Sequence, residues 1–139
     1  MINVNFQNFF DKGPVLKGVD RAEKEALGKA GAFVRRTARR SMRHKKTKPT
    51  GPPATHTGGI RNFIFFSYER FRSEVIIGPT LFRRGSKRLG VPSGAELQEF
   101  GGKAKINGRS VRYPARSYMG PAMEQEARRF PSLFEGRVQ

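Results

Sequence analysis

The chain has 139 residues, of which 36% are hydrophobic, so we expect one domain built around a single core. Its 28 lysines and arginines outnumber 11 acids, and the resulting formal charge of +17 favours a polyanionic partner that relieves self-repulsion. The absence of cysteine excludes disulfides, thiolate metal sites and cysteine nucleophiles. No apolar run approaches a membrane span, and residues 1–10 lack the features of a secretory signal, so we expect no membrane contact and a reducing cytoplasm.

The N-terminal third predicts an arm followed by a long helix. Residues 1–13 alternate apolar and polar side chains at Ile2, Val4 and Phe6, as a short strand does. The helix is expected over residues 14–43, with Pro14 in its first turn. Its apolar stripe comprises Val19, Ala22, Ala26, Ala30, Phe33, Val34, Ala38 and Met42. Small residues would let another backbone approach the helix closely: Gly28, Ala30, Gly31 and Ala32.

Positive charge is concentrated at the end of this helix. Ten lysines and arginines, and no acid, fall between Ala26 and Tyr68. At about 100° per residue, the helix arginines occupy one arc opposite the apolar stripe and the two hydroxyl residues Thr37 and Ser41. A solvated basic surface is the simpler interpretation, but the net charge favours nucleic acid or another partner. The predicted partner-facing residues are Arg35, Arg36, Arg39, Arg40, Arg43, Lys45, Lys46 and Lys48.

The middle of the chain predicts loops around a hairpin. Residues 44–59 combine lysines with prolines and glycines and lack apolar periodicity, which indicates a loop. Strands are expected over residues 60–71 and 74–77, joined near residues 70–73 and closed by Gly78 and Pro79. A second basic loop over residues 82–92 adds four further candidates for partner contact: Arg83, Arg84, Lys87 and Arg88.

The last third predicts a short helix, a hairpin and a final helix. Residues 95–100 form the short helix, which ends at Gly101 and Gly102, and a hairpin turns at Asn107-Gly108. The final helix places Pro121 in its first turn and stops at Pro131, leaving residues 131–139 as a flexible tail. Its predicted buried face comprises Ala122, Met123, Glu126, Ala127 and Phe130. The fold class is α+β: a long N-terminal and a C-terminal helix packed on a small, mostly antiparallel sheet within one domain whose core spans residues 14–130.

No pattern in the sequence indicates catalysis. The two histidines, His44 and His56, lack nearby carboxylates that would orient them or share a metal. The acids are scattered and form no paired general acid and base, and neither a nucleophile elbow nor a phosphate-binding loop occurs. We therefore expect a non-enzyme with no catalytic residue, no metal and no cofactor.

Four phrases follow one another in a fixed order: His56 to Arg61 (HTGGIR), Val75 to Pro79 (VIIGP), Leu97 to Gly102 (LQEFGG) and Pro114 to Ala122 (PARSYMGPA). In series they resemble the neck and tail-completion proteins of tailed bacteriophages, a group that includes head-to-tail joining, minor tail and virion-morphogenesis proteins. The resemblance runs from about residue 22 to residue 130, although Ser117-Tyr118 stands where Pro-Phe is usual. The matching scaffold residues are Gly58, Arg61, Gly78, Pro79, Glu99, Phe100, Gly101, Pro114, Arg116, Tyr118 and Pro121.

The resemblance implies a structural virion protein that forms a homo-oligomeric ring, a hexamer, between capsid and tail. Such a ring assembles in the host cytoplasm, lies between portal or connector and tail-tube proteins, and lets genomic DNA pass.

The residues themselves suggest local roles for three of these phrases. Gly58 and Gly59 would permit a sharp entry into a strand, Gly78-Pro79 would end one, and Pro114 with Pro121 would bracket the approach to the last helix. Arg116, fixed between two turns, is expected to contact a carboxylate, either Glu99 or an acid of a neighbouring subunit.

Two other interpretations stay open at the level of sequence. The same basic helix and loops would suit a free, sequence-nonspecific nucleic-acid-binding module that acts as a monomer. The charge could also meet acidic surfaces of portal or tail-tube proteins. Self-assembly discriminates a ring protein from a free module, since a ring needs an interface that closes on itself.

Overall fold

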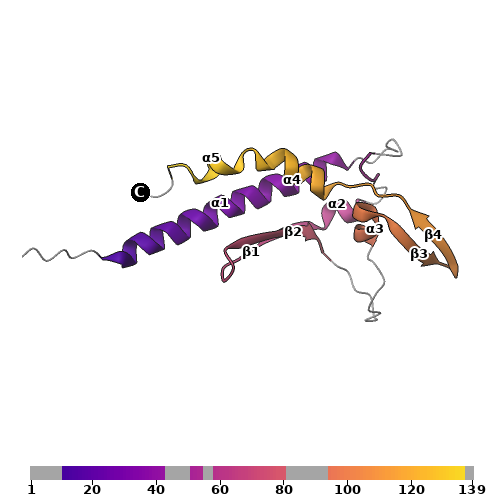
Figure 1. Cartoon of the computed structure of the whole chain (residues 1–139), viewed down its shortest axis with the longest axis horizontal. Helices are drawn as coiled ribbons and strands as arrows, with labels where there is room; N and C mark the ends of the chain where they lie inside the picture. Colours follow the sequence, from indigo (N-terminus) through magenta and orange to yellow (C-terminus); the bar gives the residue numbers. More distant parts are fainter. Residues whose placement is uncertain (1–10, 43–50, 55–57, 81–93, 137–139) are drawn as a thin grey trace, which may run out of the picture.

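The computed structural model describes residues 11–42, 51–54, 58–80 and 94–136 and confirms an α+β fold (Figure 1). Its elements in chain order are α1 (Lys12–Ser41), α2 (Gly59–Asn62), β1 (Ile64–Glu69), β2 (Glu74–Pro79), α3 (Gly94–Phe100), β3 (Gly102–Ile106), β4 (Arg109–Tyr113), α4 (Met119–Ala127) and α5 (Phe130–Phe134). The strands form two separate antiparallel hairpins and not one sheet. Among the described helices, none is both long and apolar enough to cross a bilayer.

Helix α1 is the spine of the molecule. Asp11 precedes it as the N-cap, and the Asp11 side chain accepts a hydrogen bond of 2.9 Å from the backbone N–H of Gly13. Met42 follows it in extended conformation. The predicted long helix is confirmed, with each end two residues earlier than expected. The predicted N-terminal arm, by contrast, lies outside the described residues apart from its last three positions.

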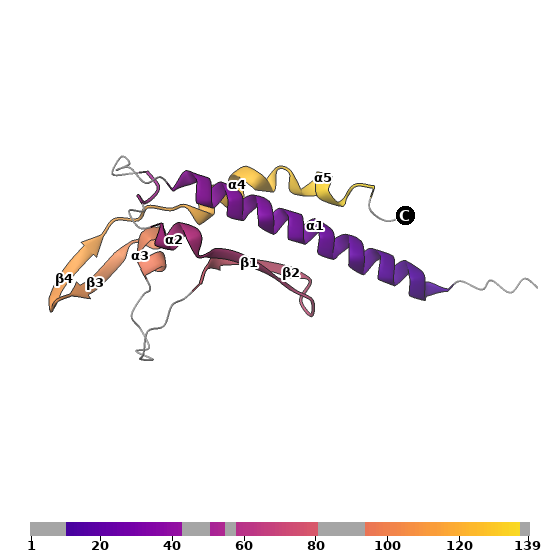
Figure 2. The same ribbon diagram turned by 180° about the vertical axis from the view of Figure 1, so that it is seen from behind.

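The core gathers around the second half of α1. Helices α4 and α5 lie along one side of α1, and the β1–β2 hairpin lies along the other (Figures 1 and 2). The buried cluster comprises Val34, Ala38, Met42, Ile64, Tyr118 and Ala122. The predicted stripe is therefore confirmed from Ala26 onward, except that Phe33 is only half-buried. It fails at Val19, which is 40% exposed because the first turns of α1 extend past the elements that cover the rest.

Glycine at position 31 lets the β1–β2 hairpin approach α1. A Cβ atom built at Gly31 would lie 2.8 Å from Cδ2 of Phe66 and 2.9 Å from Cγ2 of Val75, closer than real Cβ atoms come. The prediction of close approach is thus confirmed at Gly31. The prediction fails at Gly28, because a Cβ there would meet nothing within 4 Å and no backbone approaches closely.

The first hairpin begins later than predicted. Gly58 has a φ of +69° and starts one helical turn, α2, so the expected strand over residues 60–62 is wrong, as is the expected entry from Gly58 and Gly59 directly into a strand. The Asn62 N–H donates to the Gly58 carbonyl at 2.8 Å, a local bond that competes with strand pairing. From Ile64 onward the strands pair as expected, with Ile64 opposite Pro79 and Glu69 opposite Glu74.

The second hairpin follows α3 through a tight glycine. Gly101 has a φ of +72°, and a Cβ there would lie 2.8 Å from the Ala115 nitrogen and 2.9 Å from the Tyr113 oxygen. Strand β3 then pairs with β4 through a turn in which Asn107 and Gly108 both have positive φ, at 48° and 79°. The predicted helix end and hairpin turn are confirmed.

The C-terminal helix differs from expectation in two ways. Ala122 and Glu126 face α1 and are buried, whereas Met123 is 46% exposed and Ala127 is also exposed, so the predicted buried face was too wide. Pro131 does not stop a helix. The break comes at residues 128–129, and Pro131 lies in the first turn of α5, where its missing N–H is tolerated, so residues up to 134 continue as helix.

Candidate functional site

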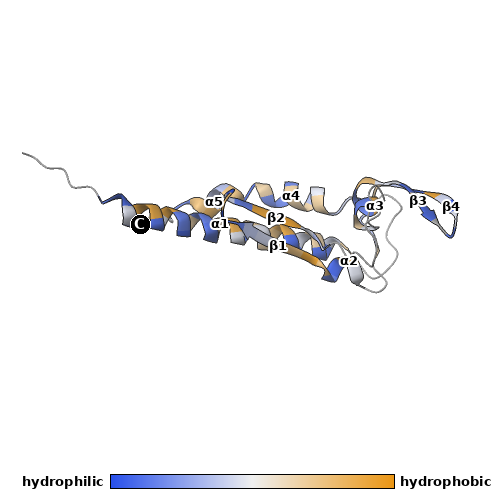
Figure 3. Cartoon of the chain, turned by 90° about the horizontal axis from the view of Figure 1, so that it is seen from below, coloured by the Kyte–Doolittle hydropathy of each residue, from blue (hydrophilic) through white to orange (hydrophobic). Residues whose placement is uncertain are grey.

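The β3–β4 hairpin, which we call the arm, projects from the end of the molecule opposite the start of α1 (Figure 3). Directly opposed residues of a hairpin share a face, and faces alternate along each strand. Lys103 is opposite Arg112, and Lys105 is two residues further along the same face. All three side chains are exposed, and no described acid forms an ion pair with them. Like charges directly opposite each other destabilise a hairpin, so this face favours an anionic partner.

The other face of the arm is mostly apolar and only partly covered. It carries Ala104, Val111 and Tyr113, with Val111 39% exposed, and the exposed cation Arg109 beside the turn. Within the described part of the chain, the only extensive contacts of β3 and β4 are with each other. A two-stranded hairpin without a packing partner is marginally stable in water. The arm therefore has the properties of a segment that packs against another molecule.

Two of the predicted partner-facing arginines instead hold the fold together. Arg35 donates from Nε to the Ile64 carbonyl at 2.8 Å, and its guanidinium lies 5.5 Å from the Phe65 ring centroid. Arg39 donates from Nε to the Arg61 carbonyl at 2.8 Å and also bonds the Asn62 carbonyl. The expected single cationic face is therefore wrong at these positions. Both side chains turn toward α2 and the start of β1, where they donate to backbone carbonyls.

The remaining helix arginines stay at the surface. Arg36 and Arg40 are exposed, and Arg36 lies 5.0 Å from the ring centroid of Phe33. The face of α1 opposite these arginines makes a polar contact that was not predicted. Thr37 on this face donates a 2.5 Å hydrogen bond to the buried Glu126 carboxylate. Burial, and then the charges of Arg35 and Arg61, lower the pKa of Arg39, so these three guanidiniums form a positive cluster.

Eight predicted contact residues lie outside the described part of the chain. They are Arg43, Lys45, Lys46 and Lys48 of the first basic loop, and Arg83, Arg84, Lys87 and Arg88 of the second. The two histidines, His44 and His56, also fall there. The predicted partner contacts of the eight lysines and arginines stay predictions.

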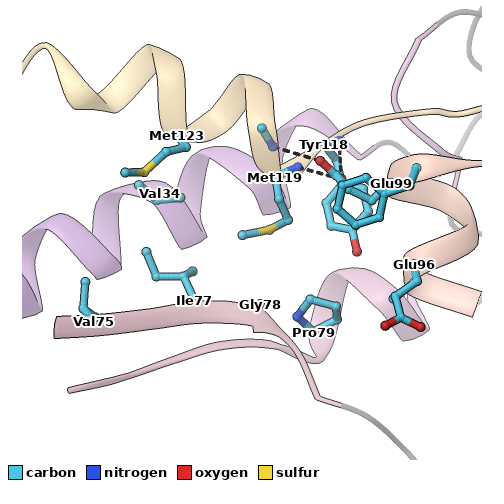
Figure 4. A pocket seen from close by; sticks show the side chains of 13 residues that line it. Val34, Val75, Ile77, Gly78, Pro79, Glu96, Glu99, Tyr118, Met119 and Met123 are labelled. Atoms are coloured by element: carbon cyan, nitrogen blue, oxygen red, sulfur yellow. Dashed lines mark hydrogen bonds between the residues drawn. The ribbon is translucent and has the colours of Figure 1, made fainter. Parts of the chain in front are cut away.

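Glu99 anchors the start of α4. Its carboxylate accepts from the backbone N–H groups of Tyr118 at 2.9 Å, Met119 at 3.0 Å and Gly120 at 3.0 Å (Figure 4). This arrangement satisfies donors that a helix N-terminus leaves unpaired and places a negative charge at the positive end of the helix. Pro121 follows in the first turn, as expected, because its position needs no donor.

Arg116 was expected to pair with Glu99, but it does not. Its Nε donates to the Gly51 carbonyl and its Nη2 to the Pro52 carbonyl, each at 3.0 Å. The expected pair with Glu99 is therefore wrong, because Glu99 is engaged by the N-terminus of α4, and Arg116 bonds backbone carbonyls of its own chain instead. Pro114, in the extended stretch before α4, and Gly78 with Pro79, at the end of β2, occupy the junctions that the sequence predicts.

An open, mostly apolar pocket of about 540 Å³ lies between α1, β2, α3 and the start of α4 (Figure 4). Its apolar lining includes Val34, Val75, Ile77, Pro79, Met119 and Met123. Phe100 also lines it and is 79% exposed. Tyr118 is 1% exposed, and its hydroxyl has no hydrogen-bond partner among the residues that the structure describes. Burial, and then the charge of Glu99, raise the pKa of Tyr118 to about 12, so this hydroxyl is a neutral donor.

Neither the arm nor the pocket is predicted as a candidate site by the patterns in the sequence. A signal for the arm was present: Lys103 and Lys105 alternate with apolar residues, and Arg112 follows the predicted turn in register with Lys103. The pocket had no comparable signal, because its lining comes from four elements that are distant in sequence. Among the described residues, no group of three acids or histidines could hold a metal ion.

Comparison with known proteins adds no relative. No family model, no curated protein and no solved structure matches the chain.

Proposed function

We propose that this protein is a structural virion protein of the neck or tail junction of a tailed bacteriophage, acting in tail completion or head-to-tail joining. Copies of the chain form a ring, a hexamer, between portal or connector and tail-tube proteins, and genomic DNA passes through it. The role requires no reaction and no cofactor. The subunit assembles in the host cytoplasm and functions in the virion.

The uncovered arm is the observation that carries this proposal. It presents a mostly apolar face without extensive packing against the other described elements and, on its reverse side, the three cations Lys103, Lys105 and Arg112. A ring subunit could cover the apolar face with a neighbouring copy and turn the basic face toward DNA. Contacts of lysine and arginine with phosphates hold DNA without reading its sequence, which suits a channel.

Three of the four phrases behind the resemblance support the same proposal through their placement. The third phrase contacts the fourth, since Glu99 bonds the start of α4 and the Arg116 N–H donates to the Gln98 carbonyl at 2.6 Å. The end of the second phrase, at Gly78 and Pro79, lines the same pocket as Glu99 and Tyr118. Phrases separated in sequence therefore form one structural junction, from which the arm projects.

The test neutralises the basic face of the arm. We expect a virion carrying Lys103→Gln, Lys105→Gln and Arg112→Gln to lose DNA retention or tail joining, because phosphate contacts are lost while the fold is kept. The matched control is Lys12→Gln, Lys17→Gln and Lys24→Gln, which removes the same charge from exposed positions at the other end of α1. Virion yield, DNA content per particle and tail attachment are the measurements. Normal yield with full DNA content in the arm variant contradicts the proposed DNA contact.

A free nucleic-acid-binding module is the second candidate, and the same basic face favours it. Such a module predicts a monomer that binds duplex DNA with a steep salt dependence. Loss of three phosphate contacts would reduce the slope of log K against log salt by about 2.7. Native mass at low and high salt, together with negative-stain images, separates the candidates: a ring that survives salt supports the virion role.

A further inference from the structure

The tip of the β1–β2 hairpin carries an unexplained phenylalanine. Phe71 is 99% exposed and lies in the four-residue turn between β1 and β2, flanked by Arg70 and Arg72. Turns are built from glycine, asparagine, aspartate, serine and proline, so turn geometry gives no reason for an aromatic residue here. An exposed aromatic ring bordered by arginines has the composition of the residues that dominate protein interfaces.

The pocket beside α4 has the complementary chemistry. Its lining is apolar over most of its surface, and its volume of about 540 Å³ is large enough to admit an aromatic side chain. The ionisable groups among the described lining residues are Glu96, Glu99 and Tyr118, and none of these residues is a lysine or arginine, although the chain carries a charge of +17. The fitting occupant is therefore an apolar group that is accompanied by positive charge.

We propose that Phe71 of one copy inserts into the pocket of the next copy, with Arg70 and Arg72 toward the acidic rim at Glu96. Phe71 cannot fill the pocket of its own chain in this structure, because it is almost fully exposed. The contact joins two different surfaces and is therefore head-to-tail, the type of interface that closes into rings. An inserted phenylalanine would bury roughly 150–250 Å². The inference rests on the proposed ring and names its interface.

Two substitutions test the two halves of this contact separately. Phe71→Ser removes the inserted side chain, and Met123→Lys places a positive charge in the pocket, where it repels Arg70 and Arg72. Both positions are exposed enough to leave folding intact, Met123 being 46% exposed, and thermal unfolding verifies this. Phe134→Ser is the matched control, because Phe134 is a partly exposed phenylalanine that does not line the pocket.

Sedimentation velocity of the purified full chain over a range of concentrations gives the result. We expect the wild type and Phe134→Ser to form rings, and each of the two variants to weaken assembly by at least about tenfold. Mixing the two variants should restore a one-to-one dimer and nothing larger. The intact pocket of Phe71→Ser accepts the intact Phe71 of Met123→Lys, and no second contact is left.

Three results would overturn the inference. Rings of Phe71→Ser as stable as the wild type would place the ring interface elsewhere and leave the proposed ring standing. Loss of assembly in Met123→Lys alone would assign the pocket to another occupant. A wild type that stays monomeric at every concentration would also overturn it, while the arm variant in virions decides the proposed function independently.

Discussion

The elements packed around the second half of α1, which we call the body, and the arm use basic residues in opposite ways. In the body, Arg35 and Arg39 donate to backbone carbonyls near the start of β1. In the arm, Lys103 and Arg112 stand opposite each other without any acid among the described residues to pair with them. Arginines of the basic region between residues 26 and 68 therefore build the fold, whereas the exposed cations of the arm lie outside that region.

The two regions also differ in how their apolar residues are used. The body buries Ile64 completely against α1, and it admits the hairpin because Gly31 has no side chain. The arm leaves Val111 39% exposed on a face that nothing described covers. Stability is thus concentrated in the body, and the arm is available for contact.

The largest difference between the body and the arm is expected when one apolar residue is truncated in each. Ile64→Ala should lower the free energy of unfolding by about 2–5 kcal/mol, because it leaves a cavity in the core. Val111→Ala should change it by less than about 0.5 kcal/mol, since it removes little buried surface. Urea denaturation of the monomeric protein measures both. Equal losses would show that the arm belongs to the cooperative core.

The junction between body and arm should show an intermediate effect. Glu99→Ala removes the acceptor of three N–H groups at the start of α4, and we expect a loss of about 1–2 kcal/mol. Glu124→Ala, on the exposed side of α4, makes the same charge change and serves as the control. Circular dichroism at increasing temperature compares the two. A loss as large in Glu124→Ala would mean that net charge, and not capping, accounts for the effect.

The smallest effects are expected within α1 itself, with opposite signs. Gly28→Ala should stabilise the protein by about 0.5–1 kcal/mol, because helix propensity improves and nothing lies within 4 Å of the new Cβ. Gly31→Ala should destabilise it, since a clash of about 1–3 kcal/mol with Phe66 and Val75 exceeds the same helical gain. Denaturant midpoints of the two variants provide the measurement. Stabilisation by Gly31→Ala would mean that the hairpin does not pack tightly on α1.

Features that depend on a few neighbouring residues could be predicted from the sequence alone. The long helix, the turn at Asn107-Gly108 and the helix end at Gly101 were all predicted within a few residues. Each depends on the conformation that one or two residues adopt, such as a positive φ that glycine and asparagine tolerate. The sequence also determined the net charge and the separation of apolar from basic positions along α1.

The tertiary structure decided where side chains and short segments go. Pro131 starts α5 and does not end a helix, and Arg116 bonds the carbonyls of residues 51 and 52 and not Glu99. The pocket exists only because β2, α3 and α4 converge on α1. A long side chain takes the partner that a distant element brings within reach, and no local pattern encodes that distance. Charge could therefore be counted from the sequence, but only the packing of distant elements separated the structural arginines from the cations of the arm.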